Sequence, residues 1–252
     1  MTSDALQELC ETGQEKLMRM DYLGAEAALA EAERHAWEER EWDTLARLYM
    51  PLQEARRQRR LRCGEGIVAL DLIAQGPDDR VSGRRVAENY PHGQLLVAGW
   101  GTIEPALELR EIQAKVGLFV ETFLGAVYPV QDEPSARIIA LVPHKDVQLP
   151  PPDPVLPMHE LTRTLPDHSI VLPADSLPTG GRRGTTETFA HVSALWEQLH
   201  LPFLAAADTQ TDPIQRIEHY RRTIRVDYAC ELAHQKLSDV ARQLLRQQRV
   251  AN

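Results

Sequence analysis

The residues best suited to chemistry lie in a glycine-rich loop that carries two arginines. The loop reads Gly-Gly-Arg-Arg-Gly-Thr over residues 180–185 and stands just before a stretch that predicts a helix. Guanidinium groups and the free N–H groups at a helix start both bind anions. Our candidates for an anion or partner site are therefore Gly181, Arg182, Arg183 and Thr185. The lysine and the glycine spacing of a phosphate-binding P-loop are absent, and a solvated linker is the alternative interpretation.

A second basic stretch holds five arginines within the seven residues 56–62. Its members Arg56, Arg57, Arg59 and Arg60 are candidates for binding an anion or an acidic partner. Acidic residues crowd the chain just upstream, and arginines near the end of a helix suit its dipole. Internal ion pairing on a solvated helix face is therefore the favoured alternative.

A third motif, Gly99-Trp100-Gly101, follows a predicted strand and precedes a predicted helix, where a dinucleotide-binding loop would lie. Glu104 occupies the position of the third glycine of that fingerprint. A carboxylate there would repel a pyrophosphate that needs the same N–H groups. The favoured interpretation is an ordinary turn between a strand and a helix.

Catalytic and metal-binding patterns are missing from the nine histidines and three cysteines. No His-x-x-x-His pair with a flanking glutamate occurs, no histidine lies two or three residues from a cysteine, and no Gly-x-Ser-x-Gly elbow exists. Cys63 lies near Arg62, which could activate its thiol, but a buried apolar role is favoured. We predict no catalytic residue, no cofactor and no metal site. Catalysis stays open, with a non-enzymatic role favoured.

Composition fits an ordinary globular protein. The chain has 252 residues, 43% of them hydrophobic and 26% charged, and a formal net charge of -9. A negative chain has no overall attraction for nucleic acid, and no apolar run approaches the roughly 20 residues that cross a bilayer. The N-terminus lacks the basic start and apolar stretch of a signal peptide. We expect a cytoplasmic protein that binds neither membranes nor nucleic acid.

Apolar residues at spacings of three and four predict helices from residue 4 to about residue 62. The first two helices resemble one tetratricopeptide repeat, in which small side chains let paired helices approach closely. The residues that carry the resemblance are Gly13, Asp21-Tyr22, Ala25, Leu29 and Ala32. Trp37 stands where such repeats often have a closing proline. The resemblance implies a helical repeat that binds another protein, and the third helix, from Trp42, would open a degenerate second unit.

The middle of the chain predicts a small α/β sheet. Short apolar runs rich in β-branched residues predict strands over residues 67–74, 94–98, 118–124 and 137–142. Residues 104–115 predict a helix, because Pro105 suits its first turn and Gly117 its end. Strand, connection, strand, helix and strand is the order typical of parallel neighbours.

Prolines crowd residues 143–178 and predict an extended, irregular segment, with an edge strand at 169–172. A helix is predicted over residues 185–200. A last helix should begin at Asp212-Pro213, a cap followed by proline, and run unbroken to about residue 248.

These elements predict a mixed α+β protein. Its expected parts are a tetratricopeptide-like helical region (1–63), a small α/β domain (64–145), a proline-rich irregular segment (146–184) and C-terminal helices (185–252). We expect an interaction or scaffold protein whose partner is another protein. The alternative is an α/β domain, flanked by helices, that binds a small anion or is an enzyme. Arginines that converge at the carboxyl ends of the strands would favour the alternative, and an open helical groove the first hypothesis.

Overall fold

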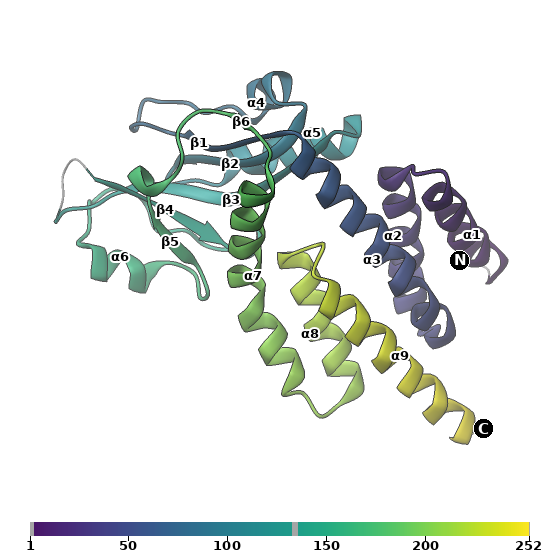
Figure 1. Ribbon diagram of the computed structural model, residues 1–252. Helices are drawn as coiled ribbons and strands as arrows, with labels where there is room; N and C mark the ends of the chain where they lie inside the picture. Colours follow the sequence, from purple (N-terminus) through teal and green to yellow (C-terminus); the bar gives the residue numbers. More distant parts are fainter. Residues whose placement is uncertain (1–2, 133–135, 252) are drawn as a thin grey trace. The chain divides into compact units, whose positions relative to one another are not determined.

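The computed structural model describes residues 3–132 and 136–251, and it confirms a mixed α+β fold (Figure 1). The chain divides into two compact units. Residues 1–60 and 200–252 form what we call the helical unit, and residues 61–199 form the sheet unit. The N-terminal and C-terminal helices, which are far apart in sequence, therefore belong to one unit.

The helical unit is built from six helices of the described chain, two of which, α3 and α7, continue into the sheet unit. Their bounds are α1 Ser3–Met18, α2 Tyr22–Glu38, α3 Trp42–Glu65, α7 Thr186–Asp208, α8 Pro213–Val226 and α9 Glu231–Ala251. Leu29, Leu45, Tyr49 and Leu237, from three of these helices, are among the residues of one apolar core. Ser238 on α9 also donates a hydrogen bond to the carbonyl oxygen of Ala46 on α3, at 2.7 Å.

The α1–α2 hairpin packs through the small residues that the sequence singles out. Ala25, Leu29 and Ala32 are fully buried. A Cβ atom added at Gly13 would lie 2.5 Å from Cγ of Leu29, a distance that real Cβ atoms do not reach. The close approach of α1 and α2 (Figure 1) therefore depends on the missing side chain at Gly13.

The two turns of the N-terminal helices share one geometry. Met20 and Arg40 each adopt a left-handed backbone conformation at the end of a helix, with φ of 61° and 56°. In each turn the next N–H bonds to a carbonyl five residues back, from Asp21 at 2.9 Å and from Glu41 at 2.8 Å. This is the six-to-one bond of a Schellman motif, so the same C-terminal cap ends α1 and α2.

The predicted unbroken C-terminal helix is wrong, because α8 ends at Val226 and α9 begins at Glu231. Asp227 makes the break. Its carboxylate accepts the N–H of Ala229 at 3.1 Å and its carbonyl accepts the N–H of Cys230 at 3.1 Å. An aspartate side chain that accepts the N–H two residues on forms an Asx turn, which competes with continuation of the helix.

The sheet unit holds a six-stranded mixed sheet of order β5-β4-β3-β2-β1-β6. β1 pairs in parallel with β2, and β2 with β3, whereas β4, β5 and β6 are antiparallel to their neighbours. The bounds are β1 Ile67–Ile73, α4 Gly83–Asn89, β2 His92–Trp100, α5 Glu104–Val116, β3 Phe119–Pro129, β4 Arg137–Val142, α6 Met158–Thr164, β5 Ile170–Pro173, the 3-10 turn Ala174–Ser176 and β6 Arg182–Arg183.

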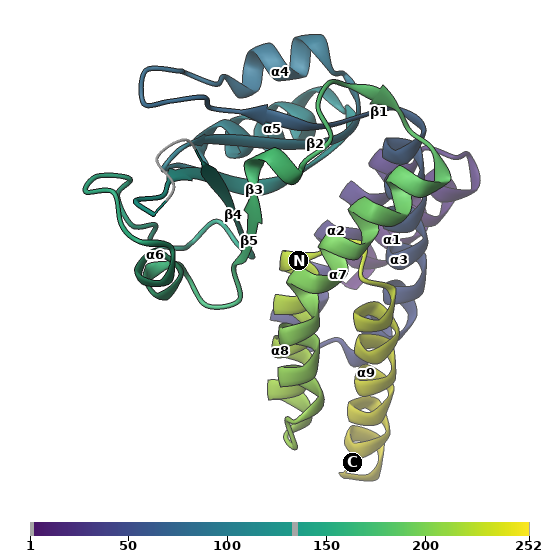
Figure 2. The same ribbon diagram turned by 60° about the vertical axis from the view of Figure 1, so that its left-hand side comes forward.

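One face of the sheet packs against α4 and α5, which lie side by side (Figure 2). On the other face, Phe123 of β3 stacks on Trp196 of α7 with ring centroids 4.3 Å apart. Because both faces of the sheet are covered, most residues of the central strands are buried and apolar, and the predicted strands read as apolar runs. Gln94 on β2 and Glu121 and Thr122 on β3 are buried polar exceptions.

The four predicted strands, the edge strand and the predicted helix at 104–115 are all present. Four elements of the described sheet unit were not predicted: α4, α6, the 3-10 turn and β6. The helix α6 corrects the view that the proline-rich segment is wholly irregular. Elsewhere the backbone carbonyls of that segment accept hydrogen bonds from β3 and the residues after it. Tyr128 donates to the carbonyl of Pro150 at 3.1 Å, and Gln131 N–H donates to the carbonyl of Leu156 at 3.0 Å.

Candidate functional site

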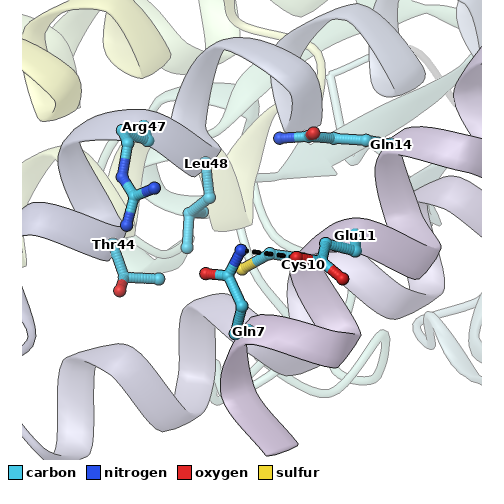
Figure 3. A pocket seen from close by; sticks show the side chains of 7 residues that line it. All are labelled: Gln7, Cys10, Glu11, Gln14, Thr44, Arg47 and Leu48. Carbon is cyan, nitrogen blue, oxygen red and sulfur yellow. Dashed lines mark hydrogen bonds between the residues drawn. The ribbon is translucent and has the colours of Figure 1, made fainter. Parts of the chain in front are cut away.

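A groove between α1 and α3 is the best-defined candidate site of the helical unit (Figure 3). Its cavity measures about 100 Å³. Cys10 and Leu48 are buried and form its apolar floor. Polar side chains from both helices form the rim: Gln7, Glu11, Gln14, Thr44 and Arg47. Heptad-like spacing on α1 explains this set, since residues 7, 10, 11 and 14 share one helix face.

Two contacts hold the rim of the groove. Gln7 donates its amide to the Glu11 carboxylate at 2.8 Å, and Arg47 pairs with Asp43 at 2.8 Å on the exposed face of α3. Burial raises the pKa of the Cys10 thiol, against the lowering effect of nearby Arg47. Cys10 is therefore a neutral thiol, and the floor of the groove is suited to an apolar or hydrogen-bonding group, not to nucleophilic chemistry.

The arginine run is taken up by ion pairs inside the helical unit. Arg56 and Arg59 both bind the Glu26 carboxylate, at 3.2 Å and 2.8 Å, and Arg60 binds Asp227 at 2.8 Å. The side chains of these three arginines are 11–14% exposed. Arg57 points outward and pairs with Glu54 at 2.9 Å, one turn away. The geometry thus matches the alternative interpretation of internal pairing, not a free basic surface.

Around these arginines lies a buried network with two histidines. His200 Nδ1 lies 2.7 Å from the Asp227 carboxylate, and the guanidinium groups of Arg59 and Arg60 lie over the ring of Tyr228 at 4.3 Å and 5.0 Å. Burial alone would lower the pKa of His200, but hydrogen bonds to Asp227 and Cys230 outweigh burial and raise it to about 9. For Asp227, burial opposes ionisation, yet Arg60 and His200 hold its pKa well below the usual value.

The second histidine, His234, is neutral by geometry. Its Nδ1 lies 2.8 Å from the carbonyl oxygen of Cys230, which can only accept, and its Nε2 lies 3.0 Å from Arg56, which can only donate. The proton must therefore be on Nδ1. Burial and the neighbouring Arg56 lower the pKa of His234 to about 3.

The arginines of the glycine-rich loop do not converge. Arg182 and Arg183 form β6, which pairs with Val68 and Ile67 at the amino end of β1. Successive side chains of a strand point to opposite faces, so these two guanidinium groups diverge. Thr185 exchanges hydrogen bonds with Thr188 and caps α7, while Gly181 packs against the side chains of Ile67 and Tyr90.

The glycine-rich loop does not lie at the carboxyl ends of the strands, where converging arginines would favour an anion-binding domain. The carboxyl end of β1 is Ile73, and β6 runs antiparallel along the first residues of that strand. Because β6 adds to the sheet as an edge strand, its two arginines are fixed at the opposite end. Only Gly180 lies further along β1, where its N–H donates to Asp71 at 2.6 Å.

An open cleft of about 430 Å³ does lie at the carboxyl ends of β1 and β2, in the sheet unit. Its ionisable lining residues are Asp79, Arg80, Glu104 and Glu108. Three carboxylates against one arginine repel an anion. The neighbouring Gly99-Trp100-Gly101 motif is a structural turn, since Gly99 N–H bonds to Thr102 O at 3.1 Å and a Cβ at Gly101 would lie 2.6 Å from Pro152.

No protein-family model, curated protein or solved structure matches the chain. The part of the chain that the structure describes contains no cluster of three or more His, Cys, Asp or Glu side chains placed to hold a metal ion. Among the same residues, no helix has the length and apolarity needed to span a bilayer. The geometry of the helices is therefore the basis for a functional proposal.

Sequence reasoning missed the groove and the histidine network. The groove was missed because most of its lining residues are polar and belong to α1 and α3, which α2 separates in the sequence, with no motif that joins them. The network had one readable signal, an aspartate inside an apolar helical pattern at Asp227, which marks a cap. His200 and His234 carry no local signal, because their partners lie on other helices.

Proposed function

We propose that the protein binds another protein in the cytoplasm through the tetratricopeptide-like helices α1–α3, as an interaction or scaffold protein. The observation that carries the proposal is the groove between α1 and α3, with its apolar floor of Cys10 and Leu48 and its polar rim. Helical repeats that bind peptides present such grooves between successive helices.

The packing of the helices supports the repeat-like part of the proposal. Gly13 and Ala25 provide the close approach of α1 and α2, and two turns of the same geometry connect α1, α2 and α3. Regular turns place successive helices at a regular angle, so α1 and α3 line the same groove.

The size of the groove favours a peptide side chain over a small molecule. Sites for small molecules measure about 300–1,000 Å³, whereas this cavity measures about 100 Å³. Its rim offers amides on α1 and a guanidinium on α3, which can hydrogen-bond the backbone of an extended peptide. A single apolar residue of the partner would then enter above Cys10 and Leu48.

The alternative, an anion-binding or enzymatic α/β domain, has less support. At the carboxyl ends of the strands, where such a domain binds its ligand, the cleft carries an excess of carboxylates. The arginines of the glycine-rich loop are at the other end of β1.

The proposal is tested by blocking the groove. The full chain with an affinity tag is used to isolate partners from native lysate, and the chain with Gln14→Trp is compared with the chain carrying Glu15→Trp. Both residues are exposed on α1, but only Gln14 lines the groove. We expect Gln14→Trp to lose a partner that Glu15→Trp and the parent chain retain, with circular dichroism and melting temperature unchanged in both.

Equal recovery of every partner by the two variants would refute the groove as the binding surface. A partner retained by Gln14→Trp but lost on a change at Glu104 or Glu108 would assign protein binding to the cleft of the sheet unit instead.

A further inference from the structure

A second, larger cleft is lined by side chains from the end of α7, from α8 and from α9, all within the helical unit. It is open to solvent and measures about 430 Å³, within the range of small-molecule sites. Polar and charged side chains dominate its lining: Asp208, Arg216, Tyr220, Lys236, Asp239, Gln243 and Arg246, with Val240. The cleft shares no lining residue with the groove between α1 and α3.

The charges of this cleft do not cancel. Asp239 pairs with Arg242 at 3.1 Å, and this pair is neutral. The remaining carboxylate, Asp208, faces three cationic side chains, Arg216, Lys236 and Arg246. The lining residues alone sum to one net positive charge. The local charge is about two positive units when Arg242, which lies outside the lining, is counted with Asp239, in a chain whose formal net charge is -9. A dianion would neutralise it.

Two of the cations have donors to spare. Arg246 is exposed and has no hydrogen bond or ion pair within the described part of the chain. Arg216 donates through Nε to the carbonyl oxygen of Gln210 at 2.9 Å, which fixes its plane and leaves its two terminal amino groups for a ligand. Planar guanidinium groups with two parallel donors match the oxygen atoms of a phosphate group.

The carboxylate of Asp208 is occupied by neighbouring donors, so it opposes an anion in the cleft less strongly. Tyr220 donates its hydroxyl proton to Asp208 at 2.5 Å, and Lys236 Nζ lies 3.8 Å from the same carboxylate. Burial and the contact with Asp208 raise the pKa of the Tyr220 phenol, so Tyr220 stays a donor. Asp208 is thus partly neutralised and positions Lys236 beside the cleft.

From this arrangement we infer that the cleft between α7, α8 and α9 binds a phosphate group, of the kind carried by a nucleotide or a sugar phosphate. A phosphate monoester carries about -1.5 to -2 charges at pH 7, which matches the excess positive charge of the cleft. The volume leaves room for the group that bears the phosphate.

The test uses the full chain, with isothermal titration calorimetry against inorganic phosphate and pyrophosphate at constant ionic strength. We expect binding of one phosphate or pyrophosphate per chain. Arg246→Gln should weaken it at least tenfold, since one guanidinium with two donors is lost. Arg249→Gln removes the same charge one turn further along α9, outside the cleft, and should change the affinity less than twofold.

Three results would overturn the inference. They are the absence of any binding at millimolar phosphate and pyrophosphate, an equal loss of affinity in Arg246→Gln and Arg249→Gln, and tighter binding of citrate than of pyrophosphate. The second result would indicate a diffuse surface attraction, and the third a carboxylate site. Both substitutions are exposed, and equal melting temperatures would confirm that neither alters the fold.

Discussion

His200, which is partly buried, and His234, which is fully buried, should together give the protein a stability maximum near pH 6.5. His200 is charged in the folded state, paired with Asp227 at 2.7 Å, and its pKa is raised to about 9. A raised pKa gives stability that is complete below the unfolded value of about 6.5 and is lost as pH rises through the folded value. On the alkaline limb of the plot of stability against pH, stability therefore falls between about pH 6.5 and 9.

The acid limb comes from His234, whose pKa is lowered to about 3 because it is buried beside Arg56. Below about pH 6.5 the unfolded chain takes up a proton that the folded chain refuses, so stability falls with pH. The full shifts correspond to roughly 3 kcal/mol for His200 and roughly 5 kcal/mol for His234. Half or more of each loss in the free energy of unfolding occurs within two pH units of the maximum.

Urea denaturation at pH 5, 6.5 and 8.5, followed by circular dichroism, measures both limbs. His200→Gln should flatten the profile between pH 6.5 and 8.5, because the titrating group is gone, and should leave the acid limb. His234→Gln should flatten the profile between pH 6.5 and 5. His159→Gln, an exposed histidine in the sheet unit, is the control and should keep the parent profile. Wild-type stability that rises steadily from pH 6.5 to 8.5 would refute the charged state of His200.

Three further changes probe other contacts. Gly13→Ala should lower the free energy of unfolding by about 1–3 kcal/mol in urea melts, because its Cβ would meet Leu29, and Gly13→Ala with Leu29→Ala should show a favourable coupling; additive losses would contradict this close packing. Asp227→Asn should cost about 3–5 kcal/mol, since it leaves Arg60 and His200 without their anion, and a loss under 1 kcal/mol would show that water replaces it. Arg182→Ala with Arg183→Ala should leave any stabilisation by phosphate in thermal melts unchanged, because β6 points the two side chains apart; its loss would return the anion site to this loop.

The sequence predicted the elements whose signals are local. The strands of the sheet read as apolar runs because both faces are covered, and α5 carries Pro105 near its start and Gly117 at its end, where Gly117 adopts a φ of 74°. The turns after α1 and α2 were harder, because Met20 and Arg40 take the left-handed conformation without being glycine. The short strand β6 consists of two exposed residues that pair with β1, more than 100 residues away, so no local sequence pattern predicts it.

The candidate sites show where local reasoning ends. The arginine run 56–60 was visible, and so was the acidic stretch upstream of it, but the partners that matter are Glu26 on α2 and Asp227 at the end of α8. Charge counts cannot distinguish a ligand-binding arginine from one that pairs with a distant carboxylate. The burial of the arginine distinguishes the two cases, because a guanidinium group whose side chain is only 11–14% exposed needs an anionic partner inside the protein.

That distinction also separates the two sets of arginines in the helical unit. Arg56, Arg59 and Arg60 are largely buried, paired and costly to disturb, so they stabilise one arrangement of α2, α3 and the end of α8. Arg216 and Arg246 line an open cleft where only one carboxylate opposes them. The buried ion pairs hold the helices in a fixed arrangement. A ligand can then bind the cationic side chains that are not neutralised, without any rearrangement of the fold. The basic run at residues 56–60, which is the most obvious in the sequence, thus has a structural role. We infer a binding role instead for Arg216 and Arg246, which lie thirty residues apart in the sequence.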